Sequence, residues 1–219
     1  MTAPRPEKPA QALVAADADG FRFAMLALER GELIAFPTDT VYALACVPTQ
    51  RRAVARFYEA KRRPPDQPAI LLSHNLGTLQ HWVRFTPRAV RLAEAHWPGP
   101  LTQVLPLNHR ALARMPVAER AALEAIAREG TVGVRIPNHA VAYDVLWAWG
   151  LPLCTSSANR AGEPAPRTGA EVAAALGADV SVVLDGECPL GVASSILDLT
   201  SPKPRVLREG AIPAEELLR

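Results

Sequence analysis

The 219-residue chain has few of the residues that mark several protein classes. Its three cysteines, Cys46, Cys154 and Cys188, are widely spaced and form no CxxC pair, which suits a reducing compartment better than a disulfide framework. The five histidines show no HExxH spacing and no neighbouring cysteine cluster, so we expect no protein-bound metal. Aromatic residues make up only 5% of the chain, which leaves few platforms on which nucleic acid bases could stack.

Long apolar runs and a strong net charge are also missing. The apolar stretch at residues 140–153 is interrupted by Asp144 and Gly150 and is shorter than the roughly 20 residues of a membrane-spanning helix. The N-terminus carries three prolines within residues 1–11 and no apolar signal-peptide core, so we expect a flexible tail over residues 1–12, no membrane segment and a cytoplasmic location. The net charge of +2 is too small to hold nucleic acid by bulk charge, although six basic residues lie within residues 51–63.

The remaining composition is that of a globular domain, with 49% hydrophobic and 21% charged residues. Helical and strand-like segments interleave along the whole chain, which predicts a single α/β domain over residues 13–219 with one twisted, mixed β-sheet flanked by helices. We predict helices at residues 21–28, 51–61, 87–96, 117–129 and 141–149, and after the capping pair Thr168 and Glu171. We predict strands at residues 33–36, 70–72, 101–107, 131–136, 151–155, 180–184, 192–199 and 205–207.

Several short polar runs follow predicted strands or helices, where α/β sheets commonly bind ligands. PTDTVY at residues 37–42 offers two hydroxyls and a carboxylate to a small polar substrate, or it forms a capped turn. KRRP at residues 61–64 directs Lys61 and Arg63 to the same side if the segment is extended, which suits a polyphosphate; the alternative is a solvated helix end. TSSAN at residues 155–159 offers hydroxyls and an amide to anionic oxygens, or it forms an Asx or Ser turn.

Arg135 is a more informative cation than Arg62, because it ends the apolar segment TVGVR. An arginine in a core strand is paired internally, for example with Asp39 or Asp198, or it faces a ligand pocket. Hydroxyls at residues 194–195 and the cation of Arg208 add further polar groups. There is no Walker A, GxGxxG, GxSxG or SxxK motif, so dispersed groups would have to hold any nucleotide and no serine nucleophile is expected.

Together these motifs resemble the YrdC-domain threonylcarbamoyl-AMP synthase family in its short, single-domain form. The resemblance covers roughly residues 20–212 and rests on motifs in a fixed order: PTDTVYAL at 37–44, KRRP at 61–64, PGPLT at 98–102, GVRIP at 133–137, SSAN at 156–159, SSILDLT at 194–200 and VLREG at 206–210. It implies a YrdC-like fold around a positively charged cavity. It also implies a nucleotidyltransferase that condenses L-threonine, bicarbonate and ATP into threonylcarbamoyl-AMP and pyrophosphate, for t6A modification of tRNA.

The resemblance also implies roles for individual residues. ATP binding falls to Lys61, Arg63, Gln67, Thr131, Ser157, Asn159, Ser194 and Arg208. Threonine binding falls to Thr40, Arg135 and Thr155, with the Arg135 guanidinium on the carboxylate. Lys61 and Arg63, with Mg²⁺ carried by ATP, would neutralise the developing charge, and no protein nucleophile or general base is required.

Some positions depart from the family pattern. Ala43 stands where glycine is usual, and Leu72 stands where many members have a histidine that contacts threonine. The YAL variation is also similar to YciO-type paralogues, and a third interpretation is an RNA-binding module without synthase activity. The chain ends soon after Arg208, so we expect no extra C-terminal domain and a reliance on separate t6A-modification proteins, with tRNA as a further candidate partner.

Overall fold

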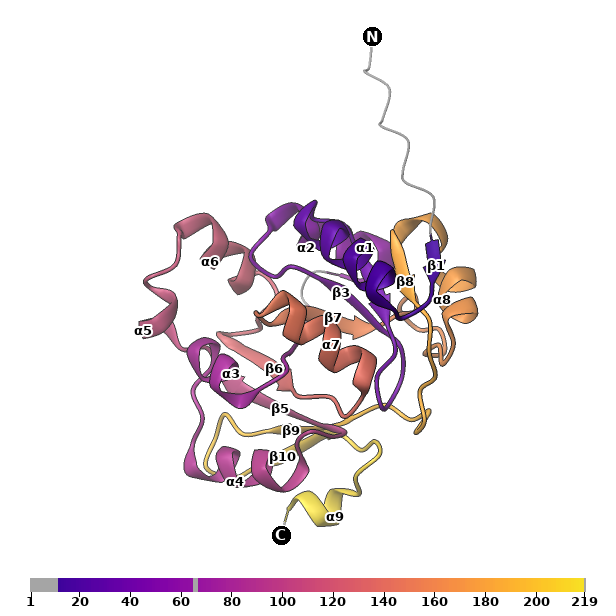
Figure 1. Ribbon diagram of the computed structural model, residues 1–219. Helices are drawn as coiled ribbons and strands as arrows, with labels where there is room; N and C mark the ends of the chain where they lie inside the picture. Colours follow the sequence, from indigo (N-terminus) through magenta and orange to yellow (C-terminus); the bar gives the residue numbers. More distant parts are fainter. Residues whose placement is uncertain (1–11, 65–66, 219) are drawn as a thin grey trace.

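The structure, a computed structural model, describes residues 12–64 and 67–218, which form one mixed sheet with helices on both faces (Figure 1). Its ten strands, within these residues, lie in the order β1-β8-β2-β3-β7-β4-β6-β5-β9-β10. Along the chain they are β1 (Ala12–Val14), β2 (Ile34–Phe36), β3 (Ala43–Cys46), β4 (Ile70–Leu72), β5 (Leu101–Pro106), β6 (Thr131–Arg135), β7 (Leu153–Ser157), β8 (Val182–Leu184), β9 (Ser195–Asp198) and β10 (Arg205–Arg208).

The helices connect these strands and cover the sheet. They are α1 (Ala18–Glu29), α2 (Arg51–Lys61), α3 (Leu76–Trp82), α4 (Pro87–His96), α5 (His109–Leu112), α6 (Val117–Glu124), α7 (Ala140–Trp149), α8 (Gly169–Leu176) and α9 (Ala214–Leu217), with a 3-10 turn, η1 (Gly177–Asp179), after α8. None of the helices in the described residues is long and apolar enough to cross a membrane. The predicted α/β class with one mixed sheet is confirmed.

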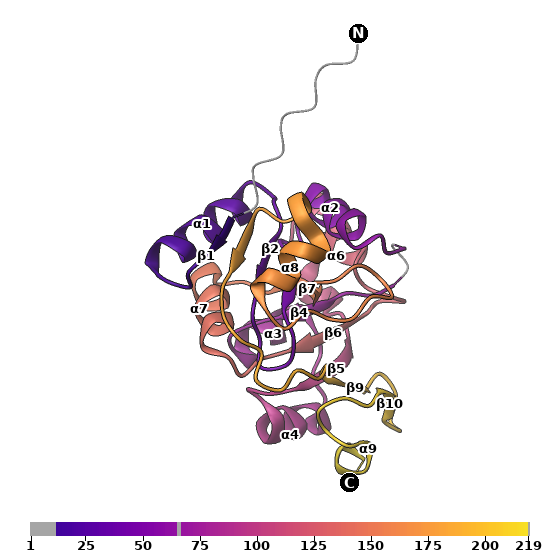
Figure 2. The same ribbon diagram turned by 90° about the vertical axis from the view of Figure 1, so that its right-hand side faces the viewer.

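The two faces of the sheet carry different helices, as Figure 2 shows. The buried residues of α1 and α7, such as Leu28 and Leu146, pack in one core cluster with Leu72 of β4. Phe57 of α2 and Val172 of α8 pack in a second cluster on the opposite face. Side chains alternate between the faces of a strand, so Leu71 belongs to the second cluster although its neighbour Leu72 belongs to the first.

The central strands fix the position of Arg135. β6 pairs with β4 in parallel, with Leu72 opposite Arg135 and Ile70 opposite Gly133. A Cβ on Gly133 would lie 2.6 Å from the Cγ2 atom of Ile70 and 3.1 Å from that of Thr102. Glycine therefore allows β4, β5 and β6 to pack closely beside Arg135.

Local sequence signals account for several confirmed elements. α2 spans the predicted residues 51–61, and α4 begins at Pro87 behind the Thr86 side chain, which accepts a hydrogen bond from the backbone of Ala89. At the start of α8, Thr168 and Glu171 form the predicted capping box.

Other element boundaries differ from the prediction. The helix predicted at 117–129 ends at Glu124, because the following residues form a turn in which Glu129 and Gly130 have positive φ angles of 50° and 72°. The predicted tail includes Ala12, but Ala12 is the first residue of β1 and pairs with Val182. The other residues of that predicted tail lie outside the described residues. The elements β1, β3, α3, α5 and α9 were not predicted at all.

Candidate functional site

A cavity of about 410 Å³ lies on the sheet face that also carries α1 and α7. Its floor includes Leu72 of β4 and Ile196 of β9, and its walls come from the loop after β2, the end of α2 and the turn after β7. All the predicted site residues except Thr131 line it, namely Thr40, Lys61, Arg63, Gln67, Arg135, Thr155, Ser157, Asn159, Ser194 and Arg208. The topology therefore brings together residues from six separated segments of the chain.

Lys61 lies deep in the wall of this cavity. Its side chain reaches the turn after β7, where the ammonium group donates hydrogen bonds to the backbone oxygen of Ser157 and, at 2.8 Å, to that of Asn159. Only 2% of the residue is exposed, so Lys61 does not belong to a solvated helix end, which was the alternative in the sequence. Burial lowers the pKa of Lys61 to about 8, and the charge of Arg63 adds to this shift.

Arg62 and Arg63 do not continue α2 as an extended segment. Arg62 ends the helix in the left-handed conformation, with φ 49° and ψ 42°, so the predicted extended geometry was wrong. The reversal still leaves Arg62 exposed and brings Arg63 to the cavity beside Lys61. The Arg63 guanidinium donates to the Gln67 side chain at 2.8 Å, to the backbone oxygen of Pro68 at 2.8 Å and to the Ser156 hydroxyl at 3.2 Å.

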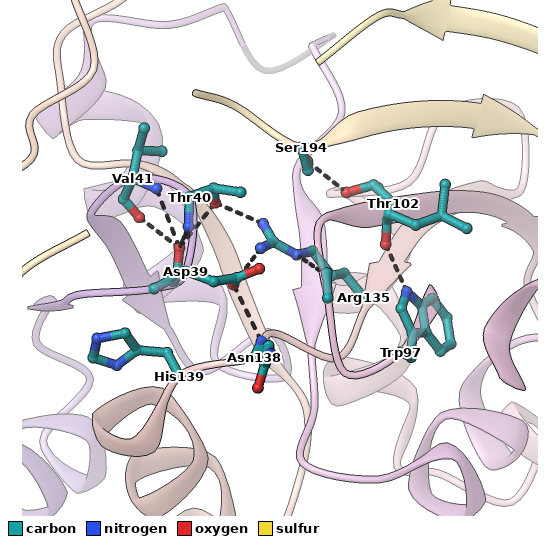
Figure 3. Close-up of polar contacts among 12 residues, drawn as sticks. Asp39, Thr40, Val41, Trp97, Thr102, Arg135, Asn138, His139 and Ser194 are labelled. Atoms are coloured by element: carbon teal, nitrogen blue, oxygen red, sulfur yellow. Dashed lines mark hydrogen bonds and ion pairs between the residues drawn. The ribbon is translucent and has the colours of Figure 1, made fainter. Parts of the chain in front are cut away.

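Arg135 is paired internally and also lines the cavity (Figure 3). Its Nη2 group forms a buried ion pair with Asp39, its Nη1 group donates to the Thr40 hydroxyl at 2.9 Å, and its Nε donates to the backbone oxygen of Gly99 at 2.9 Å. Burial lowers the pKa of Arg135, while the Asp39 carboxylate acts in the opposite direction. Asp198, the other partner considered from the sequence, pairs instead with Arg205.

The PTDT segment forms a turn that presents Thr40 to Arg135. The Thr38 hydroxyl donates to the Val41 backbone oxygen at 2.7 Å and accepts from the Thr40 and Val41 backbone N–H groups at 3.2 and 3.3 Å. The capped turn and the polar site, which were alternatives in the sequence, thus coexist. Asp39 also accepts a hydrogen bond from the backbone N–H of Asn138 at 3.2 Å, and its second carboxylate oxygen is buried without a partner.

The opposite wall of the cavity is built around Ser194. The Arg208 guanidinium donates to the Ser194 backbone oxygen at 2.8 Å and to its hydroxyl at 3.1 Å. The Thr102 hydroxyl of β5 lies 2.9 Å from the same Ser194 hydroxyl and is fully buried. Thr102 therefore positions Ser194 from behind.

Thr131 is the one predicted site residue that the structure separates from the cavity. It begins β6, whereas Arg135 ends this strand and reaches the cavity. Four residues of strand span roughly 13 Å. The Thr131 hydroxyl donates to the backbone oxygen of Arg128 at 2.8 Å, so it holds the turn before β6.

The electrostatic character of the cavity is cationic. Four cationic side chains line it, from Lys61, Arg63, Arg135 and Arg208, and Glu163 is the one acidic residue among the described lining residues. The side-chain oxygen of Asn159 is buried without a partner, while its amide N–H donates to the backbone oxygen of Glu163. The described residues contain no cluster of three or more His, Cys, Asp and Glu that could hold a metal by itself. This set of groups is suited to binding an anionic ligand, with one free acceptor for a donor or a cation that the ligand carries.

Comparison with known proteins places this arrangement in a family. The family model for Sua5, YciO and YrdC proteins, described as telomere recombination, matches residues 26–210. The chain belongs to the Sua5/YciO/YrdC family.

Two curated relatives of this family member are named threonylcarbamoyl-AMP synthase. The one from Pyrococcus abyssi is 36% identical over 198 residues, which cover 90% of this chain and 55% of the relative. The one from Xanthomonas axonopodis pv. citri is 40% identical over 167 residues, which cover 75% of this chain and 84% of the relative. The chain thus spans about half the length of the Pyrococcus relative and most of the Xanthomonas one.

A solved structure shows the same fold as this member of the Sua5/YciO/YrdC family. The crystal structure of P. abyssi Sua5 complexed with L-threonine matches with a TM-score of 0.81 and 33% sequence identity, over 95% of this chain and 58% of that one. The YrdC-like fold that the sequence motifs implied is confirmed by this match.

Sequence reasoning missed several residues that shape the site. Gly99 and Asn138 act through backbone groups, which no sequence motif reports. Thr102 is the last residue of the PGPLT motif, so its position in that motif was the available signal. Glu163 lies four residues after Asn159 and is held by it, but an isolated glutamate carries no recognisable signal.

Proposed function

We propose that this chain is an L-threonylcarbamoyladenylate synthase, which condenses L-threonine, bicarbonate and ATP into threonylcarbamoyl-AMP and pyrophosphate. The observation that carries the proposal is the convergence of Lys61, Arg63 and Arg208 from distant segments on one cavity that also holds Arg135. A triphosphate needs several cations at once, and the membership of the family supports this ligand over other polyanions.

The cavity offers separate places for the nucleotide and the amino acid. Lys61 and Arg63, with Ser157 and Asn159, form the wall suited to the phosphates. Arg135 lies on a different wall, and its hydrogen bonds to Gly99, Thr40 and Asp39 use three of the five N–H donors of a guanidinium. The two remaining donors suit the carboxylate of threonine, while the hydroxyls of Thr40 and Thr155 lie in the same cavity and suit the polar atoms of the amino acid.

The chemistry follows from these groups. The threonine amine and bicarbonate give a carbamate with loss of water. The carbamate oxygen attacks the α-phosphorus of ATP, and the bond from this phosphorus to the leaving pyrophosphate breaks. The chain positions the reactants and stabilises charge on the phosphates through Lys61, Arg63 and Arg208, which are the main tasks of a protein in phosphoryl and nucleotidyl transfer. No covalent intermediate with the protein is needed.

Mg²⁺ carried by ATP fits this site. The buried side-chain oxygen of Asn159 has no partner, and Glu163, a carboxylate residue, also lines the cavity. Oxygen ligands of these two kinds are those that Mg²⁺ prefers when it is bound together with phosphates. The chemistry that such an ion supplies is partial neutralisation of the phosphate charge.

The use of the product belongs to the same proposal. Threonylcarbamoyl-AMP is a reactive mixed anhydride, so it must pass to a transferase that moves the threonylcarbamoyl group to tRNA. We expect separate t6A-modification proteins to perform this step in the cytoplasm.

Measurement of pyrophosphate release from ATP, with and without threonine and bicarbonate, tests the proposed function. We expect release to depend on both additions and to fall roughly a hundredfold in Arg63→Ala, because a charged phosphate contact is lost. Arg62→Ala is the matched control, since Arg62 is exposed and does not line the cavity. Pyrophosphate release that does not depend on threonine would favour a YciO-type activity. Salt-dependent tRNA binding without turnover would favour an RNA-binding module.

A further inference from the structure

Two segments that are distant in the sequence form the wall of the cavity suited to the phosphates, here called the phosphate wall. The first is the end of α2 with the residues that follow it, which include Lys61 and Arg63, and the second is residues 157–161, the last residue of β7 and the turn after it. Besides the two hydrogen bonds of the Lys61 ammonium, the backbone N–H of Ala161 donates to the backbone oxygen of Lys61 at 2.9 Å. These contacts form a junction between the end of α2 and the turn after β7. The distance between the donors on the two segments therefore depends on how rigid this junction is.

Arg160 closes the junction from outside the cavity. Its Nη1 group donates to the backbone oxygen of Ala60 at 3.1 Å, and its Nη2 group lies 3.6 Å from a carboxylate oxygen of Asp179 in η1. Arg160 is not among the lining residues, and its side chain is 22% exposed. It thus connects the turn after β7 to the end of α2 and to the segment after α8.

The end of α2 gains most from this contact. The last carbonyl groups of a helix have no partner within the helix, and the C-terminal end of the helix dipole favours a cation. Arg160 supplies both the missing donor and the positive charge at Ala60, the residue next to Lys61. Asp179 fixes the guanidinium from its other side, which restricts the orientation in which Arg160 can hold the helix.

We propose that Arg160 is a positioning residue for the triphosphate site. It holds the end of α2 against the turn after β7. The distances from Lys61 and Arg63 to Ser157 and Asn159 are therefore fixed before ATP binds. This inference rests on the proposed function for its ligand. Displacement of reacting or charge-stabilising groups by about 1 Å can lower the rate by roughly a hundredfold, so loss of the contact should affect the rate as well as binding.

The decisive variant is Arg160→Met, which keeps an unbranched side chain and removes the donors. We expect its kcat for pyrophosphate release to fall at least tenfold, while KM for threonine stays within twofold, since Arg135 and Thr40 lie on other segments. Arg160→Lys retains a charge and a donor and should recover most of the lost rate. Asp179→Asn should give a smaller loss of the same kind, because the Ala60 contact remains. Arg22→Met is the control, as Arg22 also pairs with an aspartate but lies on α1.

Three outcomes would overturn the proposal. One is a kcat of Arg160→Met within twofold of the unaltered protein. Another is a uniform loss of kcat, threonine binding and melting temperature, which would make Arg160 merely structural. The third is an Arg160→Lys variant as slow as Arg160→Met.

A binding measurement separates this proposal from the proposed function. Inorganic tripolyphosphate needs no threonine and no chemistry, so its Kd by calorimetry reports the phosphate wall alone. We expect this Kd to rise at least fivefold in Arg160→Met and to stay within twofold in Arg22→Met. If the unaltered protein binds tripolyphosphate but releases no pyrophosphate with threonine, the synthase proposal fails while the positioning role stands. An unchanged Kd in Arg160→Met would overturn the positioning role.

Discussion

Arg135→Leu should damage both stability and threonine binding, because the side chain is paired internally and also lines the cavity. The side chains of Arg135 and Asp39 are 4% and 6% exposed, so the substitution leaves a carboxylate buried without its cation. Loss of one partner of a buried ion pair typically costs about 3–5 kcal/mol. A chain of this length loses about 2–4 °C of melting temperature per kcal/mol, so we expect a decrease of about 6–20 °C.

A second substitution separates the two roles. Asp39→Asn in the Arg135→Leu background removes the unpaired charge while the Asn138 N–H can still donate to the new side chain. The double variant should therefore be more stable than Arg135→Leu alone. The coupling between the two sites in the free energy of unfolding should be at least about 2 kcal/mol, above the few tenths expected for independent sites.

Denaturant unfolding of the four proteins in this cycle, with calorimetric titration of threonine, is the assay. If Arg135 also binds the threonine carboxylate, the stabilised double variant should still bind threonine at least tenfold more weakly, since a charge-assisted hydrogen bond contributes about 1.5–3 kcal/mol. Additive effects on stability would refute the reasoning about the ion pair. Normal threonine affinity in the double variant would show that Arg135 is structural and that the amino acid lies elsewhere.

Three further predictions test other parts of the site and the sheet. Because the pKa of Lys61 is lowered to about 8 in the free protein, its proton is lost as the pH rises through 8, so ATP affinity should fall there; ATP itself should raise the pKa and cause proton uptake at pH 8. Calorimetry in buffers of different ionisation enthalpy should detect this uptake, and a Lys61→Met variant with the same uptake would contradict the assignment. Thr131→Ala should have a Kd for ATP within twofold of that of the unaltered protein, because the Thr131 hydroxyl holds the turn before β6. A tenfold increase in this Kd would show that Thr131 does bind the nucleotide. Gly133→Ala should lower stability by about 1–3 kcal/mol, since its Cβ would lie 2.6 Å from Ile70, and an unchanged melting temperature would show that β4 adapts.

Elements with strong local signals could be predicted from the sequence. The apolar period of α2, the proline at the start of α4 and the capping box of α8 each act within a few residues of the chain. β3 carries no such signal, because its segment ALAC consists mostly of small residues and is held by pairing with β2 and β7. The order of the strands depends equally on long-range pairing, which a single sequence does not report.

The candidate site also combines features that the sequence predicts with features that depend on long-range contacts. The order of the motifs predicted which segments form the site. Lys61, Ser157 and Arg208 line one cavity, although about fifty or more residues separate each from the next. The burial of Lys61 could not be predicted, because its hydrogen-bond acceptors lie 96 and 98 residues away. Thr131 shares a motif with Arg135, but the length of β6 carries it away from the cavity.

The two buried cations of the cavity differ in how their charge is compensated. Arg135 is paired with the Asp39 carboxylate, so its charge is already neutralised. Its remaining N–H groups can orient a ligand through hydrogen bonds but add little net electrostatic attraction. Lys61 has two backbone oxygens and, among the described residues, no carboxylate partner. The cost of burying that charge is therefore only partly offset until an anion arrives, as its lowered pKa indicates. An uncompensated ammonium attracts a ligand that carries several negative charges, whereas a compensated guanidinium suits a single carboxylate whose orientation matters. This difference, together with the positions of the two residues on separate walls, supports the assignment of the triphosphate to Lys61 and of the amino acid to Arg135.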